Sequence, residues 1–194
     1  MGENPSLDMA QRNAMRLQRL VNQLLDLQKS EVGRREEPLI RIDVHAFLAT
    51  AGLFFAEAAL AKGVHFELRR DGAVIDPSED DGEPVYIHAD IDGLEKIVFN
   101  YLANALKFTD VGGTIALGYR SSESGTIRIE VSDTGVGISG EDIKRLFSAF
   151  TQLDDSAARK VEGTGLGLAI VKHLVQRHRG TMQIESEQGV GSVF

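Results

Sequence analysis

The order of apolar patterns from residue 39 to the C-terminus constrains the fold more than any other feature of this sequence. Short apolar runs are typical of strands, and longer runs that repeat every three to four residues are typical of helices. Strand patterns cover residues 39–44, 64–69, 85–88, 114–120, 126–131, 181–185 and 192–194, and helix patterns cover 46–62, 90–108, 141–147 and a segment ending near 179. This mixture predicts an α/β (α+β) two-layer sandwich with a mixed sheet.

A separate long helix is expected before this body. Ser6 suits an N-cap and Gly33 a helix end, and the apolar residues between them recur at alternating intervals of three and four. Such a heptad seam predicts packing against a partner helix, although a helix packed on its own domain would also be amphipathic. The predicted organisation is a helical stalk over residues 1–33, a charged linker over 34–38 and a body over 39–194.

Composition excludes several classes of protein. The chain has 194 residues and no cysteine, so disulfide scaffolds, thiolate zinc sites and thiol nucleophiles are ruled out. A formal net charge of −8 argues against a general nucleic-acid surface. The longest apolar stretch, residues 46–61, is shorter than the ~20 residues of a membrane span and contains Glu57, so we expect a buried helix. Without a signal pattern, we expect a cytoplasmic location, in a parent protein that is free or membrane-anchored.

Three polar residues share one face of the helix over residues 94–108. Asn100, Asn104 and Lys107 are spaced at i, i+4 and i+7, which places them beside the apolar stripe. Amide oxygens suit Mg²⁺, which takes other ligands from phosphates, and a lysine supplies charge for the same phosphates. The alternative is a set of solvated side chains. We treat the three residues as candidate catalytic and nucleotide-binding residues.

Two glycine-containing segments follow that helix. Asp133 stands at the end of a strand just before Gly135 and Gly137, where it could accept a hydrogen bond from an exocyclic amine or simply cap a glycine turn. The segment GTGLG, residues 163–167, opens a helix whose N-terminal amides suit phosphate. Neither a dinucleotide-binding fingerprint nor a P-loop fits these residues. The ordered set of elements indicates nucleotide binding.

These motifs resemble those of the catalytic, ATP-binding domain of sensor histidine kinases, in the wider family that contains DNA gyrase, the Hsp90 chaperone and MutL. NYLANALKFT is similar to the N box, DTGVGI to the first glycine box, LFSAF to the F box, GTGLGLAI to the second glycine box and GVGSVF to the closing strand motif. The resemblance covers residues 39–194 and implies a Bergerat-type ATP-binding fold preceded by one long helix. Residues 6–32 resemble the second helix of the dimerisation and phosphotransfer domain.

The resemblance also implies roles for single residues. Asn104 would bind Mg²⁺ at the ATP phosphates, Asn100 and Lys107 would line the same site, and Asp133 would bind the adenine amine. The other nucleotide-binding residues that it implies are Gly135, Gly137, Ile138, Arg159, Lys160, Gly163, Thr164, Gly165, Leu166, Gly167 and Leu168, with Phe147 and Phe150 as lid anchors. The two basic residues of the lid would reach the γ-phosphate when it closes, or would be solvated charges.

Position 100 bears on the mechanism. The ATP-hydrolysing relatives carry a water-activating glutamate one turn before the magnesium asparagine. Asn100 occupies that position here and cannot act as a general base. Attack by water should therefore be slow, which preserves ATP for a protein nucleophile.

The phosphoacceptor pattern is missing from the sequence. Sensor kinases carry a histidine followed by an acidic residue, and none of the five histidines here has such a neighbour. We expect the chain to bind Mg²⁺·ATP and to phosphorylate a histidine on a neighbouring dimerisation domain, in cis or in trans, without autophosphorylating by itself. The resemblance implies a homodimer formed through the N-terminal helix and a response-regulator receiver domain as the downstream partner, with no nucleic acid. The alternatives are a non-catalytic nucleotide-sensing module and a serine-directed anti-sigma-type kinase, and the heptad seam weighs against the latter.

Overall fold

A computed structural model describes residues 38–76, 83–146 and 165–194 of the chain. The expected stalk and nearly all of the linker lie outside the described residues. So do six of the candidate site residues, namely Phe147, Phe150, Arg159, Lys160, Gly163 and Thr164. The domain boundaries at residues 33 and 38 therefore stay predictions.

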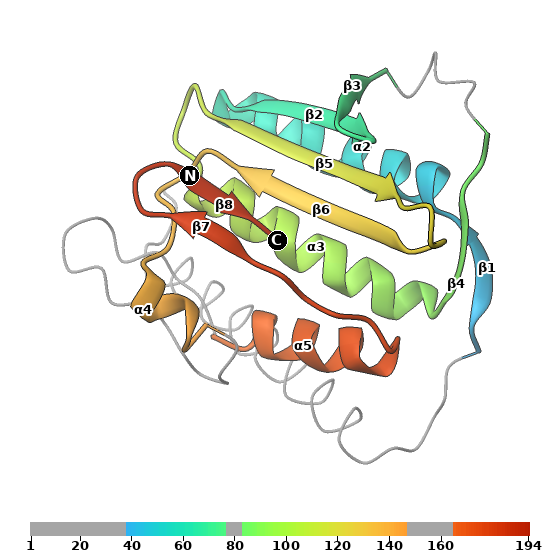
Figure 1. The fold of residues 1–194 in the computed structure, drawn as a ribbon. Coiled ribbons are helices and arrows are strands. Elements are labelled where there is room, and N and C mark those ends of the chain that lie inside the picture. The colour runs from blue at the N-terminus through green and yellow to red at the C-terminus, as the bar shows by residue number, and fades with distance from the viewer. Residues whose placement is uncertain (1–37, 77–82, 147–164) are drawn as a thin grey trace, which may run out of the picture.

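A six-stranded mixed sheet forms one layer of the body (Figure 1). Its order is β3-β2-β5-β6-β8-β7. The strands are β2 His65–Arg70, β3 Ala73–Ile75, β5 Thr114–Ser121, β6 Ile127–Asp133, β7 Glu185–Glu187 and β8 Gly191–Val193. β2 and β5 run parallel, whereas the other neighbouring strands of this sheet are antiparallel. The predicted mixed sheet is confirmed.

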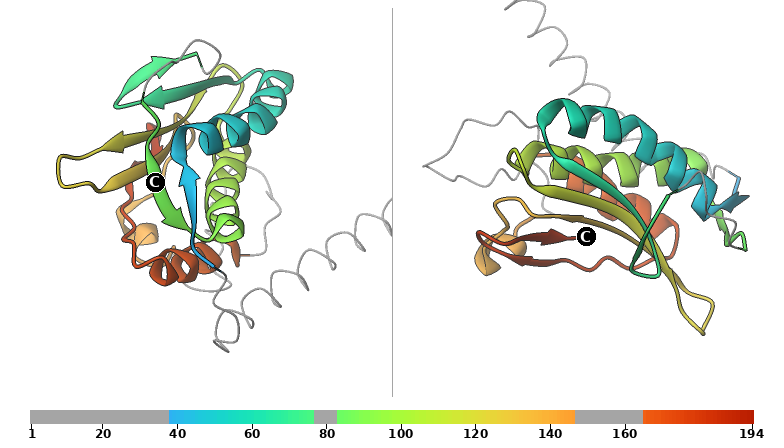
Figure 2. Two further views of the ribbon diagram at one scale, coloured as in Figure 1. Left: turned by 90° about the vertical axis from the view of Figure 1, so that its right-hand side faces the viewer. Right: turned by 90° about the horizontal axis from the view of Figure 1, so that it is seen from above.

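The second layer consists of helices on one face of that sheet (Figure 2). These are α2 Val44–Lys62 and α3 Ile91–Phe108, with α5 Gly167–Arg177 packed beside α3. The short helix α4, Gly140–Ile143, follows β6, and β1 Ile40–Asp43 pairs with β4 Tyr86–Ala89 in a separate two-stranded sheet. α2 begins two residues earlier than predicted, because the Asp43 side chain caps it by accepting a hydrogen bond from the Ala46 amide at 3.2 Å.

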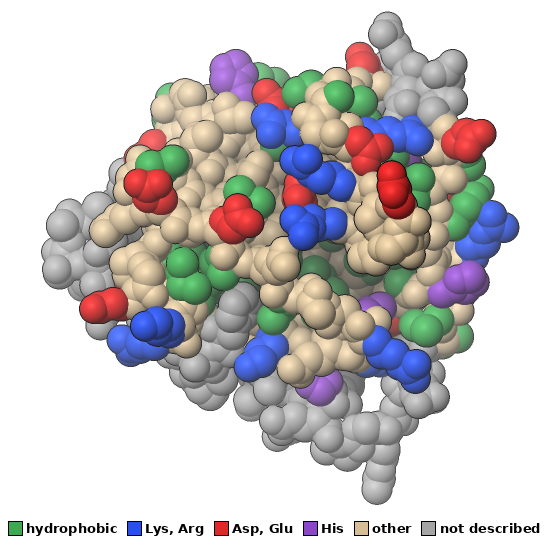
Figure 3. Space-filling view, viewed as in Figure 1, with side chains coloured by type: hydrophobic (Ala, Val, Ile, Leu, Met, Phe, Trp, Pro, Cys, Tyr) green, Lys and Arg blue, Asp and Glu red, His purple; other side chains and the backbone are tan. Residues whose placement is uncertain are grey.

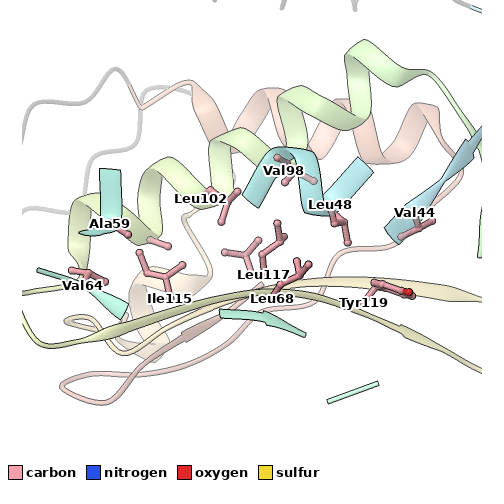
Figure 4. Packing of buried hydrophobic residues seen from close by; sticks show 13 residues of the cluster. Val44, Leu48, Ala59, Val64, Leu68, Val98, Leu102, Ile115, Leu117 and Tyr119 are labelled. Carbon is pink, nitrogen blue, oxygen red and sulfur yellow. The ribbon is translucent and has the colours of Figure 1, made fainter. Parts of the chain in front are cut away.

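Packing of the helices on the sheet leaves α3 with one polar face. Val98 and Leu102 of α3 are fully buried against the sheet, in the same cluster as Leu48 of α2 and Leu117 of β5 (Figure 4). Ile97 on a neighbouring side of α3 packs in a second cluster, whose other members are Leu166, Ile170, Val171 and Leu174. With two sides of α3 covered, its polar residues take the side that remains.

α2 is apolar on both its inner and its outer side. It has the length and a mean hydropathy, 1.6, that would allow a membrane span, but Leu48 and Ala51 lie buried in the sheet-facing core. On the opposite side, Leu53 and Phe54 are each 69% exposed. The expectation of a buried helix therefore holds for the inner face and is wrong for the outer one.

The other face of the sheet is open to solvent and carries charges of both signs (Figure 3). Arg69 forms an ion pair with Glu67 at 2.6 Å, and Arg120 forms one with Glu130 at 3.0 Å. Such paired surface charges neutralise one another locally.

Candidate functional site

The polar face of α3 forms the centre of the candidate site. Asn100, Asn104 and Lys107 are all partly buried there. Asn100 Nδ2 donates to the Lys96 carbonyl at 2.7 Å, which fixes the orientation of the amide. Burial lowers the pKa of Lys107, whose Nζ lies 4.7 Å from the centre of the Phe108 ring. The predicted alignment of the three residues on one helix face is confirmed.

The beginning of α5 lies against Asn100. A Cβ on Gly167 would sit 2.5 Å from Asn100 Oδ1, so a larger residue would push α5 away from α3. Gly165 takes a φ of +69°, which favours glycine, and Leu166 is buried between the two helices. Leu168 occupies the first turn of α5, which begins without a side-chain N-cap. A helix start of this kind suits an anion.

Asp133 ends β6 at the other end of the site. It stands between Ile115 of β5 and Ser192 of β8, and its Oδ1 accepts a hydrogen bond from the Gly135 amide at 2.9 Å. Burial raises the pKa of Asp133, and the backbone N–H groups of Gly135 and Ser192 offset part of that rise. The result is an oriented acceptor in a partly buried setting.

The loop after Asp133 is fastened to the last turn of α3. The Val136 amide donates to the Phe108 carbonyl at 3.3 Å, and a Cβ on Gly135 would lie 2.5 Å from that same oxygen. Gly137 has a φ of +65° and lies so close to the Glu187 carbonyl that any Cβ would overlap it. Both glycines are therefore required by close backbone approach, and the loop brings Asp133 to the Lys107 end of α3.

Two residues that support this loop had no assigned role in the sequence. Ser186 accepts a hydrogen bond from the Ile138 amide at 2.8 Å and donates to the Gly191 carbonyl at 2.9 Å. Gly191 has a φ of +139° and a position for Cβ that would overlap the Asp133 carbonyl. The motif GVGSVF signals Gly191, whereas a single serine in a polar strand carries no signal.

The structure thus brings the described candidates together around α3. The glycine loop meets its C-terminal end, and the start of α5 meets its middle. In the ranges that the structure describes, no group of three or more histidine, aspartate or glutamate residues could hold a metal ion. The polar face of α3 carries the amide oxygens of Asn100 and Asn104, a donor type that fits a cation which takes most of its shell from phosphate and water.

Comparisons with known proteins identify the family of this chain. The model of the family described as histidine kinase-, DNA gyrase B-, and HSP90-like ATPase matches residues 89–194. A sensor-like histidine kinase of Rhizobium meliloti is 35% identical over 90% of this chain and 31% of its own length. Sensor protein GacS of Pseudomonas syringae is 33% identical over 95% of this chain and 20% of its own length. The chain therefore spans less than a third of these relatives.

A solved structure extends the likeness to three dimensions. The crystal structure of full-length ShkA in complex with AMPPNP has a TM-score of 0.80 and 28% identity, and it covers all of this chain and 38% of its own. A mycobacterial sensor histidine kinase, MprB, has a TM-score of 0.65 at 24% identity over 79% of this chain and 93% of its own, which shows the shared fold.

Proposed function

Because this chain belongs to the family of histidine kinase-, DNA gyrase B- and HSP90-like ATPases, and its relatives are sensor histidine kinases, we propose that it binds Mg²⁺·ATP and phosphorylates a histidine of a neighbouring helical domain. The resemblance drawn from its motifs is thereby confirmed as a family assignment.

The observation that carries the proposal is the arrangement of three motifs along α3. Asp133, held by the Gly135 amide, would accept a hydrogen bond from the adenine amine. Asn104 and Lys107 lie at the α3 end nearest that loop, and the start of α5 lies against Asn100. A nucleotide placed with its base at Asp133 would have its phosphates along the polar face of α3, near the amides of α5.

Phosphoryl transfer needs positioning and charge stabilisation more than covalent help from the protein. A bound Mg²⁺ would neutralise charge on the phosphate oxygens, and the Asn104 amide oxygen would be its ligand from α3. In the step itself, the bond between the γ-phosphorus and the bridging oxygen breaks, a P–N bond to the imidazole forms, and ADP leaves. Asn100 holds no proton-accepting group, so it supports transfer to the imidazole over attack by water.

The partners follow from this role. The acceptor histidine would be supplied by a dimerisation domain of the parent chain, in cis or in trans, and a receiver domain would take the phosphoryl group from it. The two relatives named above extend well beyond the part that this chain matches. We place the reaction in the cytoplasm, where ATP is supplied.

Calorimetric titration with ATP tests the nucleotide site. In the presence of Mg²⁺ we expect the wild-type chain to bind ATP, and Asn104→Ala to bind it at least about tenfold more weakly because the metal loses an oxygen ligand. Gln176→Ala, which removes an exposed amide from α5, is the matched control and should bind as the wild type does. Equal affinity of wild type and Asn104→Ala would refute the magnesium assignment.

A second experiment separates a kinase from a nucleotide-sensing module. The chain is incubated with γ-labelled ATP, alone and with an added helical segment that carries a histidine followed by an acidic residue. We expect acid-labile label on the added segment and none on the chain alone. If the chain binds ATP and leaves the added segment unlabelled, the result favours a nucleotide-sensing module over a kinase.

A further inference from the structure

A lysine side chain from α2 contacts the last turn of α3. Lys62, the final residue of α2, points its Nζ at the Leu106 carbonyl, 2.5 Å away, and at the Lys107 carbonyl, 3.3 Å away. These two residues lie 44 and 45 positions further along the chain. A cation at the C-terminal end of a helix is favourable, because the carbonyls there carry partial negative charge.

The contact completes the capping of α3. The last four carbonyls of any helix lack partners within the helix, so each needs one from elsewhere. In α3, the Ala105 carbonyl accepts from Thr109 and the Phe108 carbonyl accepts from the Val136 amide. Lys62 Nζ donates to the two carbonyls between them, those of Leu106 and Lys107. Lys62 and the glycine loop therefore both contact the C-terminal end of α3.

Lys62 is itself held in place. Gly63, with a φ of +73°, ends α2, and its N–H donates to the Ala59 and Leu60 carbonyls. The Gly63 carbonyl then accepts from the Gly112 amide at 2.7 Å, which ties the segment after α3 to the end of α2. The position of the Lys62 backbone is thus fixed relative to α3.

We propose that Lys62 is a positioning residue for nucleotide binding: it fixes the last turn of α3, and through it the Lys107 side chain and the loop that begins at Asp133. This inference rests on the proposed function, since it concerns the same ATP site. Lys62 reaches backbone oxygens and acts on the nucleotide only through Lys107 and its neighbours.

The test is a double-mutant cycle on the full chain, read as ATP affinity in the presence of Mg²⁺. Lys62→Met keeps the aliphatic stem and removes the donor, and should weaken ATP binding about fivefold to tenfold. Lys62→Arg keeps a cationic donor and should stay within about twofold of the wild type. Lys172→Met, which removes an exposed lysine from α5, is the matched control and should not change ATP affinity.

Coupling distinguishes positioning from a general loss of stability. If Lys62 acts in part through Lys107, the double variant of Lys62→Met and Lys107→Met loses less ATP affinity than the two single losses together would give. Additive losses in affinity, or unchanged affinity in Lys62→Met, would overturn the proposal. Should Lys62→Met not fold, Lys62→Ala takes its place, because it also removes the donor, and wild-type ATP affinity in that variant would overturn the proposal too. A wild-type chain that binds no ATP would instead refute the proposed function itself.

Discussion

Asp133 is a partly buried carboxylate at the candidate site. Its carboxylate sits at the meeting point of β6, β8 and the glycine loop, where it is oriented by the Gly135 amide. Water would solvate the ionised form better than this setting does, so the pKa is raised. In the proposed function, this carboxylate is the hydrogen-bond acceptor for the adenine amine.

The raised pKa predicts how stability depends on pH. The folded state keeps the Asp133 proton to a higher pH than the unfolded chain, whose aspartate pKa is about 3.9, so this residue's contribution falls as pH rises through the window above that value. Asp133→Asn keeps an acceptor for the Gly135 amide and removes the charge. The variant should unfold at a higher temperature than the wild type at pH 7, and the difference should shrink toward pH 4.

Thermal unfolding at the two pH values checks this prediction. Glu123→Gln, a charge removal at an exposed turn, is the control and should leave the unfolding temperature nearly unchanged. An Asp133→Asn variant that unfolds at or below the wild-type temperature at pH 7 would contradict it. The same variant should bind ATP more weakly, because an amide is a poorer acceptor than a carboxylate.

Among the described candidate residues, the motif members could be proposed from the sequence because their types and spacing are tied to chemistry. Asn100, Asn104 and Lys107 share a helix face by periodicity alone, and the structure confirms that face. Ser186 and Lys62 could not be found in the same way. Each forms hydrogen bonds to backbone groups that are distant in sequence. Because every residue type carries a backbone carbonyl, the sequence does not show which of them is the partner.

At the scale of elements, both ends of α5 contact α3. The start of α5 meets Asn100, and its end meets the start of α3, where the Asp90 amide donates to His178 Nε2 at 3.1 Å. His178 Nδ1 lies 2.7 Å from the Leu174 carbonyl, so this nitrogen carries the proton and Nε2 is the acceptor. His178 therefore connects the end of α5 to the start of α3.

His178→Ala should therefore lower the free energy of unfolding by about 1–3 kcal/mol, because the Asp90 amide loses its acceptor in a partly buried place. Denaturant unfolding measures the change. His173→Ala on the same helix is the control. A smaller loss of unfolding free energy in this variant would assign the effect to the contact between His178 and Asp90, and not to α5 as a whole. Equal losses in the two variants would contradict the prediction.

Two strands, β3 and β7, were not predicted correctly from local sequence patterns. β3 was not predicted, because it has three residues and depends on a tight turn at Asp71 and Gly72, whose φ values are 48° and 91°. The strand expected over residues 181–185 lies instead at Glu185–Glu187, a polar segment whose place is set by pairing with β8. Both strands form because they pair with strands that are neighbours in space.

At the scale of the whole molecule, ATP should stabilise the fold. A ligand that binds only the folded state adds about 2.7 kcal/mol at a concentration one hundred times its Kd. For a domain of this size, that corresponds to a rise of roughly 5–10 °C in Tm. Thermal unfolding with and without Mg²⁺·ATP measures the rise, and Asn104→Ala should show much less of it. An equal rise in both proteins would place the nucleotide elsewhere.

The layer architecture follows from the sequence more closely than the strand order does. Alternating patterns predicted a mixed sheet covered by helices, and the structure confirms this arrangement. The pairing of β2 with β5 could not be predicted, since it joins His65 to Thr114 across the intervening β3, β4 and α3. No local pattern encodes which distant strand becomes a neighbour.

That parallel pair has a consequence for how the chain acquires its fold. During synthesis, β2 emerges about fifty residues before the strand that completes its main ladder. Until then, its one strand neighbour in the described part of the chain is the three-residue β3. Pairing across such a separation closes a long loop, which makes the folding transition slow and leaves β2 exposed to wrong partners. The first half of this body should therefore fold only when α3 and β5 have arrived.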